Sequence, residues 1–490
     1  MMMRELTKSD LCNPVHRVPR LHGALLSCVL LSCLGALVFP ARSPAAVASP
    51  SHAPALPDPY PSTYKPLPRS DMLIDNATVF DGIGHRLLHA GVLLHDGKII
   101  SVGSNLHAPE GTKTIDAHGG FVTPGLIDVH SHLGDFAAPF TLQDAKVSDV
   151  NEESSPNSAE VWALHSIRVQ DPQFARVRIG GVTTLQVLPG SDDLFGGRGV
   201  VLKNVPAVTV QEMEFPGAMP SLKMACGENP KYTFGEKGQF PSSEMGNVAG
   251  YRQAWIEATE YKRRWDGYYA KHDPNLAPPA RDLKLETLTA VLRNQILVVM
   301  HCYRADEMAV MMDVAKEFGY QITAFHHAVE AYKIVPLLKE NHVCVAVWAD
   351  WWGFKVEAYD GIRSNAAFVD AGGGCVMLHS DATISAEHLP LDAALTIGAA
   401  HRAGIDISEE HAIEWLTINP ARSLHLDEQI GSLEPGKNAD VVVWSGDPFS
   451  VYTRASIVII DGAIVYDRND PGRQATSDFE VGQPAIERPR

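Results

Sequence analysis

The chain has 490 residues, of which 45% are apolar, so it is long enough to bury one large core together with a smaller attached domain. Its 41 Lys and Arg residues stand against 58 Asp and Glu residues, a formal net charge of −17 that does not suggest nucleic acid or an anionic membrane surface as a partner. Many soluble enzymes are equally acidic, so the charge does not identify a substrate.

The first fifty residues resemble a secretory leader. Arg17 and Arg20 precede an apolar run over 24–39, and Pro40 then ends it. Ala46–Ala48 matches an A-x-A cleavage site, so we predict a signal peptide over residues 1–48 and export to the periplasm or the medium. A membrane anchor is the alternative, but the apolar run is short for a membrane span. We expect no membrane association after cleavage.

Four cysteines remain beyond the leader, and no two of them form a CxxC motif. Export would permit disulfides. However, three of the four lie in or beside strongly apolar runs, where buried free thiols are the expected state. These cysteines are Cys226, Cys302, Cys344 and Cys375.

A linker rich in Pro and Ser covers residues 49–69, and short alternating segments follow over 70–121. The Asp96-Gly97 turn signal within them favours a small antiparallel sheet. Short strand-like segments return over 426–467, with a hairpin around Asp461-Gly462. We predict that both ends of the mature chain form one composite β-sandwich. The polar tail over 468–490 is expected to be poorly ordered.

Between these two segments, over 122–425, apolar strand-like runs alternate with helix-like stretches. Continuous apolar strands separated by helices predict a parallel sheet covered on both faces. About 300 residues of this α/β pattern fit a (β/α)8 barrel of the TIM type, with insertions, placed between the two halves of the sandwich. A doubly wound open sheet is the alternative, but no GxGxxG motif opens the chain.

Two histidines, His130 and His132, end the first strand of this region, in VTPGLIDVHSH. Residues i and i+2 of a strand point to the same face, so both imidazoles can converge on one metal ion. Later strand-like runs also end in histidine or aspartate. In a parallel barrel these ends meet at one face, where active sites are built. The later candidates are His301, His326, His327 and Asp381, with Lys223 and Glu228 near the end of another short segment.

These motifs resemble the amidohydrolase superfamily, in the branch that contains imidazolonepropionases and metal-dependent Xaa-Pro or Xaa-Arg dipeptidases. The resemblance covers roughly residues 70–467. It rests on LIDNATVFDG, PGLIDVHSH, GVTTLQ, His301, FHH, HSD and the return NPAR…IGSLEPGKNADVVVW.

The resemblance implies a set of metal ligands: His130, His132, His301, His327 and Asp381, with Lys223 as a carboxylated bridging lysine. His326 remains an alternative to His327. Glu228 remains an alternative to Lys223, and the site could instead hold a single metal. Imidazole and carboxylate ligands suit a divalent ion, zinc first, at one or two ions per chain.

The implied reaction is hydrolysis of a C–N bond in an amide, a dipeptide or a cyclic amide by a metal-activated water. Asp381 is expected to act as general base and then as general acid, while His327 polarises the substrate carbonyl. Tyr303 and Arg304 follow His301, where an arginine could bind a substrate carboxylate, although local pairing of Arg304 at the barrel rim is an equal alternative. The expected partner is a small-molecule substrate. The sequence is also compatible with a homo-oligomer.

Two other functions are weighed against this one. Deaminases of the same barrel carry a Glu three residues after the fifth-strand histidine, where this chain has Arg304. A non-catalytic exported ligand-binding protein on the same barrel should have lost one of the ligands, and none is missing.

Two further stretches are expected to lie beside the predicted site. The aromatic stretch Trp348–Trp352 either forms the wall of a pocket or packs in the core. The glycine-rich stretch Ser191–Gly199 is expected to be a substrate-facing loop.

Overall fold

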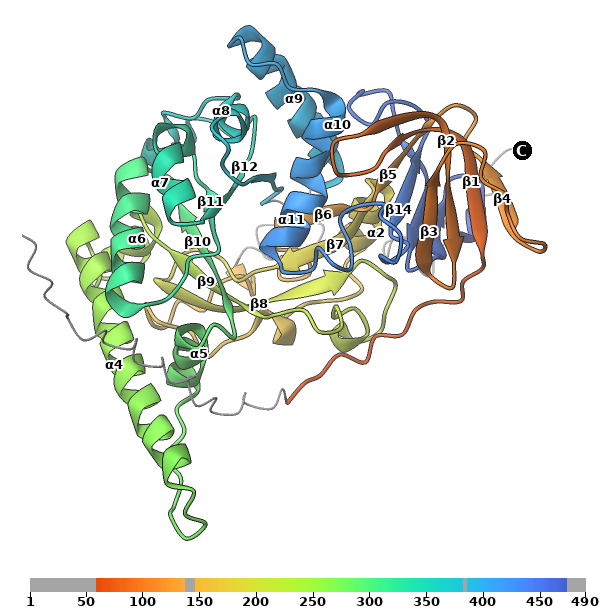
Figure 1. The fold of residues 1–490 in the computed structure, drawn as a ribbon. Coiled ribbons are helices and arrows are strands. Elements are labelled where there is room, and N and C mark those ends of the chain that lie inside the picture. Colours follow the sequence, from red (N-terminus) through yellow and green to blue (C-terminus); the bar gives the residue numbers. More distant parts are fainter. Residues whose placement is uncertain (1–58, 137–145, 382–385, 474–490) are drawn as a thin grey trace, which may run out of the picture. The chain divides into compact units, whose positions relative to one another are not determined.

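The computed structural model describes residues 59–136, 146–381 and 386–473 (Figure 1). The predicted signal peptide, residues 49–58 of the linker and most of the tail lie outside the described residues. Within the described part of the chain, no helix combines the length and the apolar character needed to cross a membrane.

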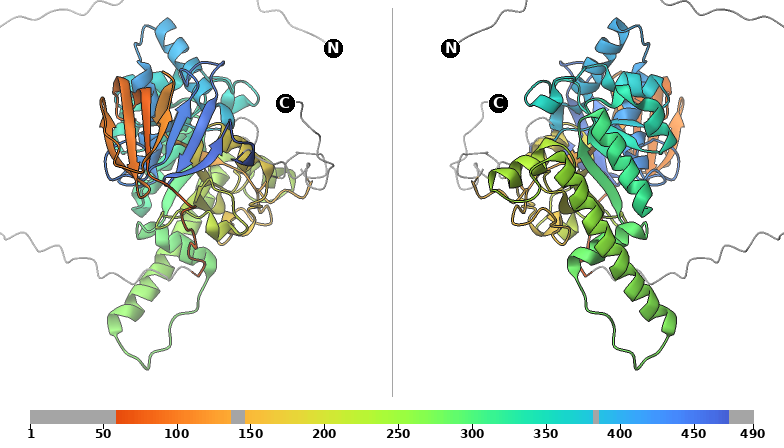
Figure 2. Two further views of the ribbon diagram at one scale, coloured as in Figure 1. Left: turned by 90° about the vertical axis from the view of Figure 1, so that its right-hand side faces the viewer. Right: turned by 90° about the vertical axis from the view of Figure 1, so that its left-hand side faces the viewer.

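Both ends of the described chain contribute strands to a single eight-stranded sheet, in the order β16-β15-β14-β5-β1-β2-β3, with β4 also paired to β1. Figure 2 shows the N-terminal and C-terminal strands side by side. The strands are β1 (Met72–Phe80), β2 (Arg86–His95), β3 (Lys98–Gly103), β4 (Lys113–Asp116), β5 (Phe121–Pro124), β14 (Val441–Trp444), β15 (Ala455–Ile460) and β16 (Ala463–Asp467).

The junction between the two ends is a short antiparallel ladder. Val122 of β5 pairs with Val443 of β14, and both side chains are buried in one apolar cluster. Trp444 Nε1 donates a hydrogen bond to Thr123 Oγ1 at 2.9 Å, across 321 residues of sequence. The two ends therefore join as the sequence predicted. The division of these strands into two packed layers stays a prediction.

A second sheet of eight strands follows the chain order from β6 to β13. Its two edges approach each other, because Asp381 N, just past β13, donates to His130 O on β6 at 3.0 Å. The result is a nearly closed barrel, in agreement with the predicted fold class. The strands are β6 (Leu126–Ser131), β7 (Val182–Val187), β8 (Phe195–Lys203), β9 (Ser221–Ala225), β10 (Leu297–Cys302), β11 (Ala324–His327), β12 (Cys344–Val347) and β13 (Val376–Leu378).

One strand departs from the predicted all-parallel barrel. β8 runs antiparallel to both β7 and β9, and no α-helix separates these three strands. Much of the glycine-rich stretch that was expected to be a loop lies in β8. Gly197 has φ +108°, a backbone conformation that favours glycine, and the ladder shifts register between Phe195 and Gly197. The glycines therefore permit an irregular strand against β9.

Both faces of the barrel strands are buried. Val298, Met300 and Phe325 point outward and pack against helix side chains, while Ala324 and Ala346 belong to a separate inner cluster. This arrangement explains why the strands read as continuous apolar runs. The helices are α2 (Pro172–Ile179), α3 (Glu228–Glu236), α4 (Glu244–Lys271), α5 (Leu283–Leu292), α6 (Ala305–Phe318), α7 (Val335–Glu340), α8 (Asn365–Ala371), α9 (Leu389–Arg402), α10 (Glu409–Ala412) and α11 (Ile418–Ser423).

The four cysteines form two disulfides, Cys226–Cys302 and Cys344–Cys375, so the expectation of free thiols is wrong. The strand register explains the pairing. Ala225 pairs with His301 on β9 and β10, and Val345 pairs with Val376 on β12 and β13. Each cysteine therefore lies opposite its partner on a neighbouring strand, although 76 or 31 residues separate the two in sequence.

Candidate metal centre

The predicted strand-end residues meet at one end of the barrel. His130 and His301 lie near the ends of β6 and β10, and His326 and His327 end β11. Two more residues, His379 and Asp381, follow β13 directly. The histidine side chains are almost fully buried, while the Asp381 side chain retains 18% of its exposure. Only the carboxylate therefore reaches towards solvent within this set of residues.

Three groups surround His130 Nε2. His132 Nε2 lies 3.2 Å from it, Lys223 Nζ 3.1 Å and Asp381 Oδ1 3.2 Å. Asp381 Oδ1 is also 3.4 Å from His132 Nε2. The structure thus brings together His130, His132, Lys223 and Asp381, as the sequence predicted.

The tautomer of His132 follows from its other nitrogen. His132 Nδ1 lies 2.8 Å from the Leu188 carbonyl oxygen, which can only accept a hydrogen bond. Nδ1 must therefore carry the proton, and the lone pair of the neutral ring stands on Nε2, which faces the centre. This pattern is typical of a histidine that ligates a metal.

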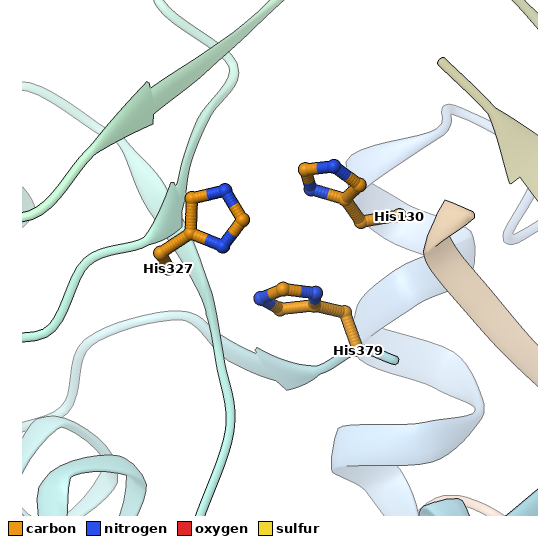
Figure 3. A group of neighbouring side chains, drawn as sticks. All are labelled: His130, His327 and His379. Carbon is orange, nitrogen blue, oxygen red and sulfur yellow. The ribbon is translucent and has the colours of Figure 1, made fainter. Parts of the chain in front are cut away.

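A second group of nitrogens combines His130, His327 and His379, whose nearest nitrogen atoms lie within 4.8 Å of one another (Figure 3). His327 Nδ1 and both nitrogens of His379 have no hydrogen-bond partner among the described residues. Buried polar atoms are almost always paired, so orphaned imidazole nitrogens at one point indicate a missing cation.

His379 belongs to the HSD motif, but the sequence assigns it no role, because Asp381 is the expected ligand at this strand end. The sequence does contain a signal for a role of His379 in the centre. His379 follows Val376–Leu378 directly, as His326 follows its own apolar run. Residue 377 faces the inner core, so strand alternation also points residue 379 inward.

Both histidines at the end of β11 reach the centre. His326 Nδ1 lies 2.8 Å from His130 Nδ1, whereas His327 Nδ1 lies 3.7 Å from Asp381 Oδ2. His327 Nδ1 has no hydrogen-bond partner among the described residues, which favours His327 as the ligand and leaves His326 as support for His130.

His301 points inward beside a buried ion pair that the sequence did not suggest. Within the described part of the chain its two nitrogens have no hydrogen-bond partner, and Nε2 lies 3.8 Å from Glu357 Oε1. Glu357 is in turn 2.5 Å from Lys355 Nζ. Glu357 lies in a short 3-10 turn after β12, and its local sequence gives no signal of a role.

Burial sets the protonation of these groups. It lowers the pKa of His301 to about 4 and that of His379 to about 3, so both rings are neutral near pH 7 and can donate lone pairs. Burial also lowers the pKa of Lys223 to about 8, which brings its amine closer to the neutral form that carboxylation requires. Burial acts to raise the pKa of Asp381, but its close contact with the His132 ring and the nearby amine of Lys223 hold that pKa below the ordinary value.

The backbone is strained where two of these residues sit. His327 has φ +71° and Asp381 has φ +52°, values that cost energy for residues with a β-carbon. Asp128 stabilises the backbone next to Asp381, because its carboxylate accepts hydrogen bonds from Ser380 Oγ at 2.6 Å and Ser380 N at 3.2 Å. The same carboxylate accepts from His130 N at 3.2 Å and so ties β6 to the segment after β13.

The donor set fits a divalent ion. Two ligand atoms on a tetrahedral zinc ion, each about 2.0–2.1 Å from the metal, stand roughly 3.3 Å apart. The separations among His130, His132 and Asp381 are 3.2, 3.2 and 3.4 Å. The residues therefore fit one ion here. His327 and His379, which group with His130, and His301, whose ring centre lies 4.4 Å from that of His327, are the donors available for a second ion.

Of the remaining predicted residues, Tyr303 packs against the cluster, with its ring centre 4.8 Å from that of His301 and 5.1 Å from that of His327. Glu228 begins α3, and its backbone N donates to Glu357 Oε2 at 3.0 Å. Tyr303 is buried against Trp348, with Lys355 Nζ 3.9 Å from its ring centre. Arg304 is bound by both carboxylate oxygens of Asp306, the local pairing that was the alternative to substrate binding.

Two cavities lie beside the centre. One, of about 420 Å³, is lined by five carboxylates, among them Glu228, Glu307 and Glu357. The other, of about 340 Å³, is lined by His327 and by Trp348, Trp351 and Trp352. The tryptophan stretch therefore forms the wall of a pocket that reaches a residue of the centre.

Comparisons with known proteins give consistent results. A family model described as "Amidohydrolase family" matches residues 367–466. The crystal structure of an amidohydrolase from Thermotoga maritima superposes with a TM-score of 0.74 and 35% identity, over 81% of this chain and all of that one. Amidohydrolase tasK of Hapsidospora irregularis is 29% identical over 79% of this chain, which spans 41% of that protein's length. An imidazolonepropionase of Legionella pneumophila is 22% identical over 76% of this chain and 92% of its own.

Proposed function

Because this chain belongs to the amidohydrolase family, we propose that it is a metal-dependent hydrolase of carbon–nitrogen bonds, acting on an amide, a dipeptide or a cyclic amide. The observation that carries the proposal is the convergence of His130, His132, Lys223 and Asp381 at mutual distances that suit one ion. The resemblance to an imidazolonepropionase supports the same reaction class.

A divalent ion held by these residues would supply Lewis acidity, which acidifies water and polarises a carbonyl. The chain itself supplies the proton transfers. Asp381 is ionised near pH 7 and is partly open to solvent, so its carboxylate can take a proton from water and return it to the leaving nitrogen. The buried imidazoles stay neutral, and His327, 3.7 Å from Asp381 Oδ2, is placed to orient the substrate carbonyl.

We further propose that the protein is exported. The leader-like first 48 residues support this, and so do the two disulfides, which form and persist in oxidising compartments.

The test is a substrate panel combined with metal analysis. The zinc-loaded protein should hydrolyse a member of a panel of dipeptides, N-acyl amino acids, hydantoins and imidazolones, and should contain one or two divalent ions per chain. A fully active protein without metal would refute the proposal.

Lys223 provides a second measurement. If Lys223 bridges two ions, Lys223→Ala should lower the metal content from two ions to one, because the bridging ligand is lost. Glu228→Ala serves as the matched comparison and should keep both ions. Unchanged stoichiometry in Lys223→Ala would argue for Glu228 as the bridge or for a single-metal site.

A further inference from the structure

The cavity beside His327 combines apolar walls with one cation. Its lining includes Trp348, Trp351, Trp352 and Arg363. Trp348 Nε1 donates to Trp351 O at 2.8 Å, and Trp352 Nε1 donates to Tyr359 O at 3.1 Å. Since these two indole N–H groups are already used, their rings offer only apolar faces to a ligand. Trp352 remains 65% exposed, an unusual position for so large an apolar side chain.

Arg363 is the cation of this cavity that is available to a ligand. Its side chain is exposed, and within the described residues it forms no hydrogen bond or ion pair. The other cations around the centre are engaged. Arg304 is bound by Asp306, Lys355 by Glu357, and Lys223 lies inside the centre.

Two polar residues of the same cavity do not compete for this role. Asn365 uses its amide, because Nδ2 donates to Ala328 O at 3.0 Å and Oδ1 accepts from Tyr332 N at 3.1 Å. It therefore supports the segment that follows His327. Asp350 also lines the cavity but forms no ion pair with Arg363, so the guanidinium is not neutralised from within its described lining.

From these contacts we propose that Arg363 binds the free carboxylate of the substrate, and that the tryptophan walls hold an apolar or aromatic side chain on the same part of the molecule. The ligand class is an amino acid residue with a free α-carboxylate, joined through its nitrogen to the bond that is cleaved. A guanidinium can bind a carboxylate through two parallel hydrogen bonds, which gives orientation as well as affinity. The inference rests on the proposed function and narrows it to C–N substrates that end in a carboxylate.

The position of the cavity supports the assignment. It is lined by His327, whose Nδ1 lies 3.7 Å from the Asp381 carboxylate. A ligand seated in it would therefore extend directly from the residues that handle the reacting group. Arg304, the arginine expected from sequence to bind a carboxylate, lines the acidic cavity instead.

The test is a binding measurement that does not depend on turnover. L-Phenylalanine and phenethylamine share the ring and the ammonium group, but only the first has a carboxylate. Calorimetric titration of the zinc-loaded protein should show tighter binding of L-phenylalanine. Arg363→Gln should lower the affinity for L-phenylalanine at least tenfold and leave the affinity for phenethylamine unchanged. Arg363→Lys should have an intermediate affinity for L-phenylalanine.

Two parallel variants sharpen the result. Arg263→Gln, on the exposed side of α4, should bind both ligands as the wild type does. Arg304→Gln tests the competing arginine. The inference fails if Arg363→Gln retains wild-type affinity for L-phenylalanine, if Arg304→Gln alone loses that affinity, or if the wild type does not distinguish the two ligands.

Kinetics separate this failure from failure of the proposed function. With a dipeptide that the enzyme hydrolyses and its C-terminal amide, Arg363→Gln should raise KM for the free acid alone and change kcat little. Equal effects on both would refute the role of Arg363 while leaving C–N hydrolysis intact. Absence of hydrolysis across the panel, with Arg363-dependent binding preserved, would refute the function and not the carboxylate site.

Discussion

Asp381 stands apart from the other groups of the centre because it is an acid that remains partly open to solvent. Its Oδ1 faces His130 and His132, while its Oδ2 faces His327. The left-handed backbone at this position is held by the hydrogen bond from Asp381 N to His130 O. Such a fixed carboxylate can contact both a metal ion and a water molecule.

We expect Asp381→Asn to keep bound metal but to lower kcat by about 10²–10⁴-fold, the usual contribution of a general acid or base. The amide oxygen can still ligate an ion, but the group can no longer accept a proton. Turnover and metal content should be measured on the same preparation. Asp313→Asn, on the exposed face of α6, is the matched control, and a wild-type kcat in Asp381→Asn would contradict the mechanism.

The site residues that could be predicted from the sequence are those that interrupt or end an apolar strand. His130, His132, His301 and Lys223 interrupt or end apolar runs, and the structure brings all four to the centre or its edge. His379 was missed because Asp381 already accounts for the polar end of its strand. Its ring centre lies 5.0 Å from that of His130, against 4.9 Å for His327, and Figure 3 shows the three rings together.

At the scale of elements, Cys226–Cys302 joins the ends of β9 and β10, the two strands that carry Lys223 and His301. Cys344–Cys375 joins the start of β12 to the residue before β13, at the opposite ends of the strands. One disulfide is therefore placed beside the centre and the other away from it.

Removal of either disulfide should lower the free energy of unfolding by about 2–4 kcal/mol, because the unfolded chain gains freedom. The double variant Cys226→Ser/Cys302→Ser should also weaken metal affinity, since Cys302 follows His301 directly. Cys344→Ser/Cys375→Ser is the comparison and should change stability alone. Denaturant unfolding and metal titration measure the two effects, and equal metal affinity in both variants would contradict the expectation.

The elements missed from sequence share a physical cause. The disulfide pairs and the reversed direction of β8 both depend on which strand lies beside which, and in what register. Apolar periodicity reports burial along one strand and carries no information about its neighbour. Alternating runs and turn signals did predict the strands and helices of the barrel and the short strands at both ends, because those features are local.

At the scale of the whole molecule, the centre should couple metal binding to stability. His327 Nδ1 and both nitrogens of His301 and His379 are buried with no hydrogen-bond partner among the described residues, so a bound cation would satisfy them. A ligand that binds only the folded chain stabilises it by about 2.7 kcal/mol at a hundredfold excess over Kd.

We therefore expect chelation to lower the Tm and to abolish activity, and added zinc to restore both. Magnesium should restore less than zinc, because imidazole-rich donor sets favour zinc. Calorimetry with and without chelator checks this expectation, and an unchanged Tm after complete removal of metal would contradict it.

The ladder between β5 and β14 has a consequence for the order in which the protein is made. Thr123 of β5 accepts its hydrogen bond from Trp444, which is synthesised 321 residues later. At a synthesis rate of about 5–20 residues per second, the edge of β5 therefore stays unpaired for roughly 16–64 s. During that time the whole barrel leaves the ribosome while the sheet beside it is incomplete. An unpaired strand edge invites aggregation, so the nascent chain has to keep β5 protected until its last strands arrive.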